Sequence, residues 1–273
     1  MSLHLTLRHQ PDVPLEAETL SPDRLAGFDA AAIAVLPVMH GNRKAVVADF
    51  FDVASAAGAA DTLVLEGDLS RVKRIGESMT RGRIMIKGNA GMHTGVDMRG
   101  GEIVVEGDAG DWVGAEMQGG RIVVKGNAGH QAGSVYRGGH KGMLGGELFI
   151  LGDAGAELGN SMRRGLIAVG GACGDFAGVN MLAGTIIVFG EMGWRACAGM
   201  TRGTVVGMQG ARVLPTFTFD CVYRPTFLRM LLLHLRAQGL PVTDAQIAGE
   251  YKRWSGDHIS LGRGELLLLA DSR

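Results

Sequence analysis

Short runs of alternating apolar and other residues recur along the middle of the chain. In "GGEIVVEGDAGDWVGAEMQGG", residues 100–120, Ile103 and Val105 are separated by one residue. Side chains two residues apart lie on the same face of a strand, so this period predicts strands rather than helices. The equivalent pairs are Ile84/Ile86, Ile103/Val105, Ile122/Val124, Leu148/Ile150, Ile167/Val169 and Ile186/Val188.

The alternation belongs to a longer repeat that approximates G-x-I-x-V-x-G-[DN]-A-G-x-x-x-G-x-x-M. Its units start 19 residues apart, except for one interval of 26 residues that contains a seven-residue insertion. A preceding unit, "TLVLEGDLSRVKRIGESM", is degenerate and has two extra residues. One short strand cannot bury its apolar face alone, whereas coils of about 19 residues that stack on one another bury a continuous column. The repeat therefore predicts an all-β fold, a parallel β-helix of about seven to eight coils.

The segments on either side of the repeat have different patterns. Before it, a helix is expected to start at Ser21, and two strands are expected to join through the turn at residues 40–42. After it, one helix is expected to start near Pro225 and a second to span about 244–254. The predicted regions are an N-terminal cap (1–60), the β-helix (61–210) and a C-terminal helical and strand extension (211–273).

Equivalent positions of successive units predict columns of side chains. A recurring methionine, replaced once by Tyr136, is expected to form an internal ladder, because flexible thioethers fill irregular cores. Two outward columns alternate acidic and basic residues, and opposite charges on neighbouring strands fix the register of the coils. The columns are Met79, Met98, Met117, Tyr136, Met162, Met181 and Met200; Arg83, Glu102, Arg121 and Glu147; and Glu66, Lys87, Glu106 and Lys125.

Further along, the outward face of the repeat becomes apolar over several coils. A contiguous apolar surface is normally covered, so either the chain's own C-terminal segment or another subunit is expected to lie on it. We predict partner contacts at this face. The residues concerned are Phe149, Ile187, Phe189 and Val206.

The insertion "SVYRGGHKGMLGG" raises a loop from the otherwise regular repeat. Loops raised from a rigid scaffold commonly carry function, so a partner contact through Tyr136, Arg137, His140 and Lys141 is one interpretation. A solvated glycine-rich bulge is the other. The insertion is also expected to project from the stack, where its two cations would attract an anionic carrier chain only modestly in physiological salt.

Composition limits the classes of partner and compartment. A formal net charge of −1 gives no reason to expect nucleic acid or an anionic membrane as partner. The chain has 44 glycines, as tight corners require, and lacks both an apolar run of about 20 residues and the features of a signal peptide. Three cysteines without metal-binding spacing are expected to be reduced, buried thiols. The sequence predicts a soluble, cytoplasmic protein.

The pattern contains no recognisable catalytic, cofactor-binding or metal-ligating residues. The eight histidines show none of the spacings of metal sites. Polysaccharide-cleaving β-helices need convergent carboxylates and aromatic platforms, whereas aromatic residues make up 5% of this chain and the outer carboxylates are matched by cations. Hexapeptide and calcium-binding nonapeptide repeats have other periods. An autonomous enzyme acting on a carbohydrate or acyl substrate remains an alternative.

The repeat, followed by "LPTFTFDCVYRPTFLRMLL", "YKRWSGD" and "GRGELLLL", resembles the C subunit of the formyltransferase/hydrolase complex of methylotrophic bacteria over nearly the whole chain. That protein is homologous to the C subunit of formylmethanofuran dehydrogenase. Its repeat is similar to the right-handed β-helix at the C-terminal end of the glutamate synthase large subunit. The resemblance implies a right-handed β-helix for this chain also.

The resemblance implies a function in one-carbon metabolism. In that family the complex moves a formyl group from formyl-tetrahydromethanopterin to a methanofuran-like carrier and hydrolyses it to formate. Hydrolysis is assigned to the metal-dependent A subunit and transfer to the D subunit. The expected role of this chain is a non-catalytic scaffold that binds no cofactor by itself and contacts subunits A, B and D. The C subunit of an archaeal-type formylmethanofuran dehydrogenase is the alternative within the family.

Overall fold

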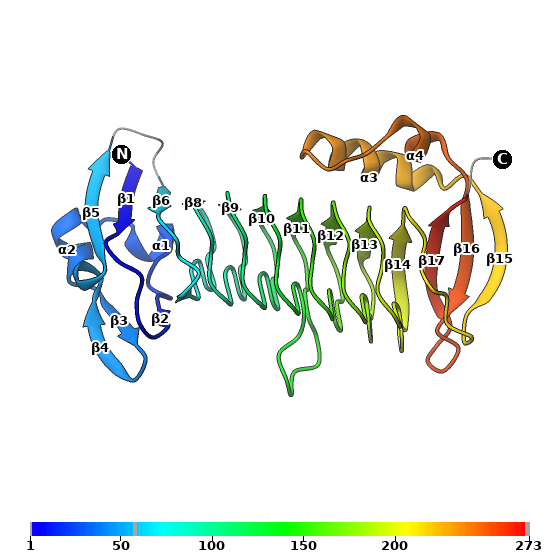
Figure 1. Ribbon diagram of the computed structural model, residues 1–273, viewed down its shortest axis with the longest axis horizontal. Coiled ribbons are helices and arrows are strands. Elements are labelled where there is room, and N and C mark those ends of the chain that lie inside the picture. Colours follow the sequence, from blue (N-terminus) through cyan, green and yellow to red (C-terminus); the bar gives the residue numbers. More distant parts are fainter. Residues whose placement is uncertain (1, 57–58, 60, 271–273) are drawn as a thin grey trace.

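The structure, a computed structural model, describes residues 2–56, 59 and 61–270. A 13-stranded sheet runs along the whole length of an elongated molecule (Figure 1). Its middle strands are parallel, and antiparallel strands close both ends. A second sheet of four short strands lies at the N-terminal end. The chain is mostly β with few helices, in agreement with the alternating pattern.

The parallel strands follow one another in sequence order, each pairing with the next. Ile84 pairs with Ile103 and Ile103 with Ile122, so the chain returns to the same register after 19 residues. The predicted repeat is therefore the structural unit, called a coil below. The strands are β6 (Thr62–Glu66), β8 (Arg83–Lys87), β9 (Glu102–Val105), β10 (Arg121–Val124), β11 (Glu147–Ile150), β12 (Leu166–Val169), β13 (Thr185–Val188) and β14 (Arg202–Gly207).

Apolar side chains fill the interior of the stack in continuous columns. The alternating strand residues, such as Ile103 and Val105, are fully buried. A second column of single parallel bridges runs through Ala90, Ala109 and Ala128, and larger side chains, Leu69 and Met192, stand at its two ends. Because each coil covers the apolar face of the one before it, the stack buries a core that no single strand could form.

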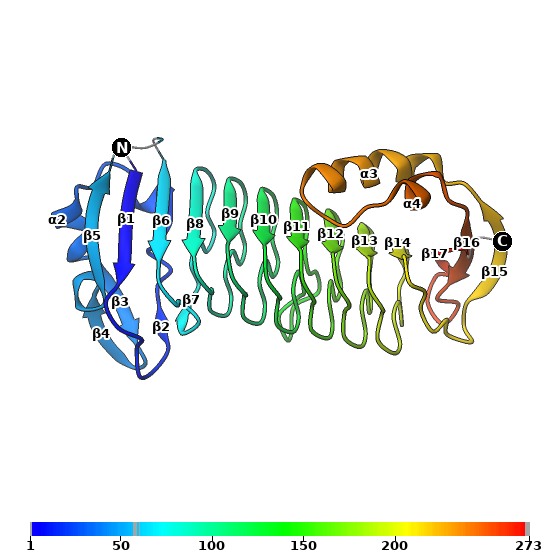
Figure 2. The ribbon, with the colours of Figure 1, turned by 45° about the horizontal axis from the view of Figure 1, so that its top comes forward.

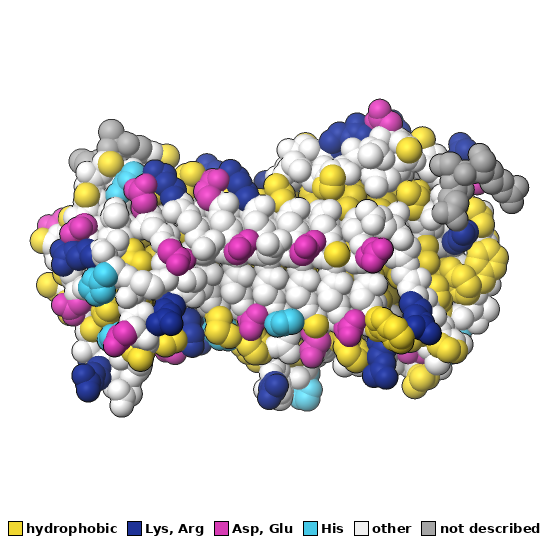
Figure 3. Space-filling view, in the orientation of Figure 1, with side chains coloured by type: hydrophobic (Ala, Val, Ile, Leu, Met, Phe, Trp, Pro, Cys, Tyr) yellow, Lys and Arg dark blue, Asp and Glu magenta, His cyan; other side chains and the backbone are white. Residues whose placement is uncertain are grey.

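The Asp or Asn of the repeat joins neighbouring coils through side-chain hydrogen bonds. Oδ1 of Asn89 accepts the backbone N–H of Asp108 (3.0 Å), and Oδ1 of Asp108 accepts that of Asn127 (2.7 Å). Asn and Asp both carry an Oδ1 atom that accepts a hydrogen bond, so either residue can occupy this position of the repeat. Their alternation places carboxylates two coils apart, about 9.6 Å, and thereby limits repulsion. Figure 3 shows one row of acidic side chains spaced out along the stack.

A glycine is required where each coil turns into its strand. Gly101 has φ of +85°, a conformation that L side chains rarely adopt, and a Cβ there would lie 2.5 Å from Cε of Met79. The backbone carbonyl of Gly82 would also be only 2.6 Å away. The glycine therefore permits both the turn and the close approach of the neighbouring coil.

The charge columns form the predicted ion pairs across coils. Arg83 Nε lies 3.0 Å from Glu102 Oε2, and Arg121 Nη1 lies 4.0 Å from the other oxygen of Glu102. In the other column, Lys125 Nζ lies 2.6 Å from Glu106. Each partner occupies the neighbouring position in the ladder, which confirms the register that the sequence predicts.

The N-terminal region covers the first coil. β1 (Ser2–Leu7) adds a parallel strand beside β6, and β5 (Phe51–Ala56) then pairs with β1 in the antiparallel sense. The predicted turn at residues 40–42 is confirmed. The remaining elements are β2 (Leu15–Glu16), α1 (Pro22–Leu25), α2 (Ala30–Ala34), β3 (Pro37–His40), β4 (Arg43–Val46), the short helix η1 (Val47–Asp49) and β7 (Val72–Lys73).

The C-terminal region closes the other end and then turns back along the stack. β17 (Arg263–Leu269) pairs with β14 in parallel, and β16 (Tyr251–Gly256) and β15 (Thr218–Tyr223) continue the sheet in antiparallel fashion. The helix α3 (Thr226–Ala237) begins directly after Pro225, as predicted, and lies along the C-terminal half of the stack (Figures 1 and 2).

The second C-terminal helix is shorter than expected. α4 spans Asp244–Ala248 and has the capping box of Thr243 and Gln246 at its start. The predicted end near 254 is wrong, because Gly249 terminates the helix and residues 251–256 pair as β16 with β17. Within the described residues, no helix is long and apolar enough to span a membrane.

Candidate functional site

The insertion projects from the stack between β10 and β11 as the only long loop of the coil region in Figure 1. Arg137, His140 and Lys141 lie in its exposed part. Figure 3 shows basic and histidine side chains at the tip of this projection. The loop therefore presents cationic and imidazole groups away from the coils, as expected. Its contact with a partner stays a prediction.

The position of Tyr136 differs from the prediction. Met143, not Tyr136, occupies the buried methionine column, because the inserted residues lie between Gly133 and Met143. In a regular coil the methionine amide donates to the carbonyl of the glycine three residues before it, as Met98 does to Gly95. The amide of Met143 makes the equivalent bond to Gly133 O (3.0 Å), across the inserted residues. The remaining predicted members of the internal ladder are confirmed as fully buried: Met79, Met98, Met117, Met162, Met181 and Met200.

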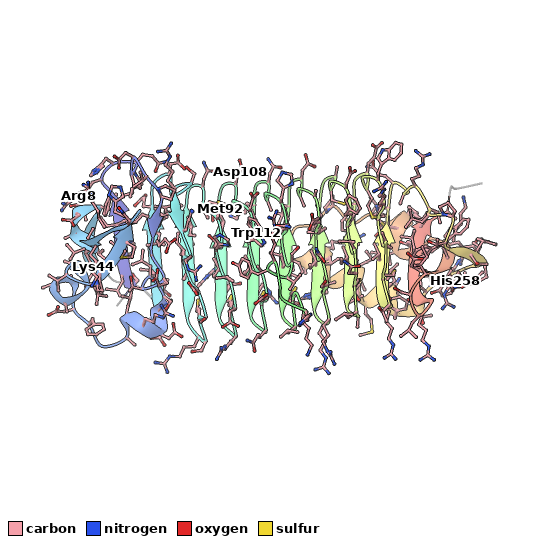
Figure 4. All side chains as sticks on the ribbon, turned by 90° about the horizontal axis from the view of Figure 1, so that it is seen from below. Arg8, Lys44, Met92, Asp108, Trp112 and His258 are labelled. Atoms are coloured by element: carbon pink, nitrogen blue, oxygen red, sulfur yellow. The ribbon has the colours of Figure 1, made fainter. Side chains whose placement is uncertain are left out.

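Tyr136 instead anchors the base of the loop on the outside of two coils. Its hydroxyl lies 2.7 Å from Nδ1 of His93, and its backbone N–H donates to Oε1 of Glu116 (3.1 Å). The ring of Trp112 stacks on His93 with centroids 5.4 Å apart and lies 6.2 Å from the ring of Tyr136. Trp112 is labelled in Figure 4, which views the molecule from the side of the projecting loop.

The surroundings keep this aromatic cluster (His93, Trp112 and Tyr136) uncharged near neutral pH. Burial lowers the pKa of His93, and the nearby cations Arg74 and Lys73 lower it further. Burial also raises the pKa of Tyr136 to about 12. A phenol that remains protonated and a half-buried neutral imidazole form a stable hydrogen bond. The cluster is therefore suited to holding the loop in place.

Sequence spacing contained a signal for this cluster. His93 and Trp112 are 19 residues apart, so they occupy the same column in adjacent coils. Both have left-handed backbone conformations, with φ of 64° and 58°. An imidazole beside an indole matches no metal-ligand pattern, so metal-binding spacings do not single out this pair. Tyr136 joins them only because the insertion shifts it out of the interior.

The apolar outer face is covered by the chain's own C-terminal helix. Phe149, Ile187, Phe189 and Val206 are buried in one cluster with α3 residues, so the prediction that they contact a partner needs correction. Of the two coverings considered, the structure contains the internal one. α3 is amphipathic and turns one apolar side toward this face. Its buried residues are Leu228, Leu232 and Leu235.

A polar contact also connects α3 with the stack. His234 Nε2 lies 2.8 Å from Oε1 of Glu147 on β11, and the ring of His234 packs edge-on against Phe149. Glu147 is at the same time the last member of a charge column, with Arg121 Nε 2.8 Å from its other oxygen. The helix therefore docks through both apolar burial and a shared carboxylate.

The cysteines are free, but they differ in environment. Cys173 and Cys197 are buried, as predicted, and burial raises the pKa of the Cys173 thiol to about 11. Cys221 lies on the edge strand β15 and is exposed, so the expectation that all three are buried is wrong. Among the described residues, no three or more His, Cys, Asp or Glu side chains gather as a metal site.

Comparison with known proteins places these features in a family. The family model described as GXGXG motif matches residues 83–212. A chain of the formyltransferase/hydrolase complex FhcABCD from Methylorubrum extorquens, solved with methylofuran, is similar at 33% identity and a TM-score of 0.90. The match covers 98% of this chain and 99% of that chain.

Curated relatives match a shorter region. The C subunit of the tungsten-containing formylmethanofuran dehydrogenase 2 of Methanothermobacter thermautotrophicus is 44% identical over 94 residues, which cover 33% of this chain and 35% of that protein. The C subunit of the molybdenum-containing formylmethanofuran dehydrogenase 1 of Methanosarcina barkeri is 46% identical over 85 residues, 30% of this chain and 28% of that protein. This chain thus matches about a third of the length of these relatives. Together with the full-length structural match, they show that the chain belongs to the family of the C subunits of formylmethanofuran dehydrogenases and of the formyltransferase/hydrolase complex.

Proposed function

We propose that this chain is a non-catalytic scaffold subunit of a formyltransferase/hydrolase complex. The observation that carries the proposal is the 33% identity over 98% of the chain to a component of FhcABCD. The complex would convert formyl-tetrahydromethanopterin to formate through a formyl-methanofuran-like carrier. Subunits A, B and D would be its partners, with hydrolysis at a metal in the first of them and transfer in the last.

The arrangement of the chain supports a scaffold role. The stacked coils with 19-residue register are those of a right-handed parallel β-helix, which we propose over residues 61–210, between a cap at 1–60 and an extension at 211–273. Such a stack is stiff, because every coil is hydrogen-bonded to two neighbours along its length. Its loop, ends and outer faces can then hold other subunits at fixed separations.

The chemistry of this chain's residues supports the proposal that other subunits hold the carrier and the metal. In the aromatic cluster, Nδ1 of His93 and the hydroxyl of Tyr136 are hydrogen-bonded to each other, and the phenol stays protonated near neutral pH, so we assign this pair to holding the loop. The described residues bring together no three metal-ligating side chains. Therefore no step of the reaction is assigned to a metal or cofactor on this chain.

Copurification from co-expressed subunits tests the proposal. A tagged chain should elute with three other polypeptides, and the complex should produce formate from formyl-tetrahydromethanopterin while the isolated chain does not. A monodisperse chain that is active alone on a carbohydrate or acyl substrate would establish the autonomous enzyme instead. Elemental analysis separates the alternative within the family: tungsten or molybdenum in the purified complex would indicate the dehydrogenase named for the curated relatives.

A further inference from the structure

A hollow lies at the corner where three successive coils turn into β12, β13 and β14. Its volume is about 510 Å³. Three arginines and small apolar residues line it, and Leu261 of the loop before β17 contributes a wall. We call this hollow the arginine groove. Its defining residues are Arg163, Arg164, Leu182, Ala183, Arg202 and Leu261.

The described part of the chain places no neutralising carboxylate beside the arginines of the arginine groove. Elsewhere on the stack, arginines pair with glutamates of the next coil, as Arg83 does with Glu102. Within residues 2–56, 59 and 61–270, no carboxylate lies within 4.0 Å of the guanidinium groups of Arg163, Arg164 or Arg202. The ladder neighbour of Arg202 on β17 is another arginine, Arg263. Like charges in register repel, and a bound anion would relieve that repulsion.

The wall of the arginine groove is held in a fixed position. Asp257 is buried, and its carboxylate accepts the backbone N–H groups of Gly199 (2.9 Å) and Ile259 (3.1 Å). Ser260 Oγ donates to Gly199 O (3.0 Å). These bonds tie the loop to the last coil, so Leu261 stands beside the arginines while remaining 56% exposed. A preformed site of this kind loses less entropy when a ligand binds.

The chemistry of the lining favours an acidic peptide. Guanidinium groups bind carboxylates with paired hydrogen bonds, and Leu182, Ala183 and Leu261 offer contacts to aliphatic side chains. Arg163 and Arg202 belong to coils two apart, about 9.6 Å, which an extended peptide spans in about three residues. None of the described residues that line the hollow is aromatic, whereas proteins that bind single-stranded nucleic acids rely on aromatic side chains for base stacking.

We propose that the arginine groove binds an extended, glutamate- or aspartate-rich segment of a partner subunit that also carries aliphatic side chains. This inference rests on the proposed function for the origin of the segment, whereas the recognition itself belongs to the isolated chain. The groove would then be one of the surfaces through which the scaffold selects its partner.

Binding of a labelled peptide to the full chain tests the recognition. The probe is fluorescein-labelled Gly-Glu-Leu-Glu-Glu-Leu-Glu-Gly, measured by fluorescence anisotropy at low and physiological salt. The triple variant Arg163→Gln, Arg164→Gln and Arg202→Gln should weaken binding by about tenfold or more, because each lost charge-assisted bond contributes to affinity. Leu261→Glu should also weaken it, by placing a competing carboxylate in the groove of an unchanged fold.

A charge-matched control separates the groove from overall charge. Arg43→Gln, Arg81→Gln and Arg229→Gln remove three exposed arginines elsewhere and should leave affinity unchanged within about twofold. A peptide with Gln in place of every Glu should not bind. The proposal is overturned if neither peptide binds, if the control weakens binding as much as the triple variant, if citrate displaces the peptide at equal concentration, or if an eight-nucleotide oligothymidylate binds as tightly.

The complex provides the second readout. The triple variant should copurify with less of one partner subunit than the control does. If the peptide binds the groove but no partner copurifies with the natural chain, the scaffold function fails while the recognition stands. If the complex forms equally well with the triple variant, the groove is not a subunit contact and the proposal is wrong although the scaffold function holds.

Discussion

Nε2 of His234 lies 2.8 Å from Oε1 of Glu147, so one carboxylate joins the docked helix α3 to the charge column of the coils. The other oxygen of Glu147 holds Arg121 at 2.8 Å. The helix and the register of two coils thus depend on the same side chain. α3 is therefore a structural part of the stack.

Removing the charge of Glu147 should loosen α3. We expect Glu147→Gln to lower the free energy of unfolding by about 1 kcal/mol and to speed hydrogen exchange in α3, because the ion pair with Arg121 and the contact with His234 are both partly exposed. Glu106→Gln is the matched control, since Glu106 pairs with Lys125 away from α3. Equal exchange rates in α3 for both variants would contradict a docking role.

Truncating Ile187 should destabilise the chain itself. The side chain is fully buried between the sheet and α3, so Ile187→Ala should cost about 2–5 kcal/mol through lost contacts and a residual cavity. Met230 on the outer side of the same helix is 76% exposed, and Met230→Ala should change stability by less than about 0.5 kcal/mol. Urea unfolding of both variants checks the difference. Similar costs would mean that α3 does not cover this face.

Shortening the projecting loop should affect assembly and leave the fold intact. The deletion must stop at residue 141, because Met143 fills the methionine column. Deleting residues 138–141 should leave the thermal midpoint of the isolated chain nearly unchanged, whereas Met143→Ala should cost about 2–5 kcal/mol. Gel filtration of the complex then measures assembly. If assembly and turnover were unchanged with the shortened loop, the loop would be only a solvated bulge without a partner contact.

Acid should weaken the anchor of the loop. The pKa of His93 in the folded chain lies below its usual 6.5, so the unfolded chain binds the proton more readily. The stabilisation from the neutral ring is therefore complete above pH 6.5 and is lost as the pH falls toward the folded-state pKa. His93→Gln cannot titrate and provides the reference. Urea unfolding between pH 5 and 8 should show the natural chain losing stability relative to this variant only below about 6.5. If the difference in unfolding free energy between the two proteins were constant from pH 5 to 8, the pKa of His93 would not be lowered in the folded chain.

Periodicity predicted the coils because the units repeat the same local demand: two alternating apolar residues, in most units a small residue beside the next backbone, and a glycine at the turn. Gly101 and Ile103 meet that demand in the same places as their equivalents 19 residues away. Breaks in the period were harder to predict. Tyr136 and Met143 both fit the methionine column by character, and only the bond from Met143 to Gly133 shows where the extra residues enter.

The covering of the apolar face was also undetermined by sequence. Leu228, Leu232 and Leu235 indicate an amphipathic helix, but such a stripe does not specify which surface it will cover. The direction of the chain after β15 decides this, and it turns α3 back over Phe149 and Ile187. The exposure of Cys221 is likewise not encoded locally: β15 is the last strand of its sheet, with no neighbour beyond it among the described residues.

The antiparallel strands at the two ends give the molecule a discrete length. β5 ends the parallel ladder beyond β1 on one side, and β16 and β15 end it beyond β17 on the other. Duplication or loss of a 19-residue unit between them would leave both ends chemically unchanged. The distance between a partner held at the N-terminal end and one held at the arginine groove would then change in increments of about 4.8 Å, the spacing of hydrogen-bonded strands. Variants of the chain with different numbers of units would therefore hold these two partners at different distances.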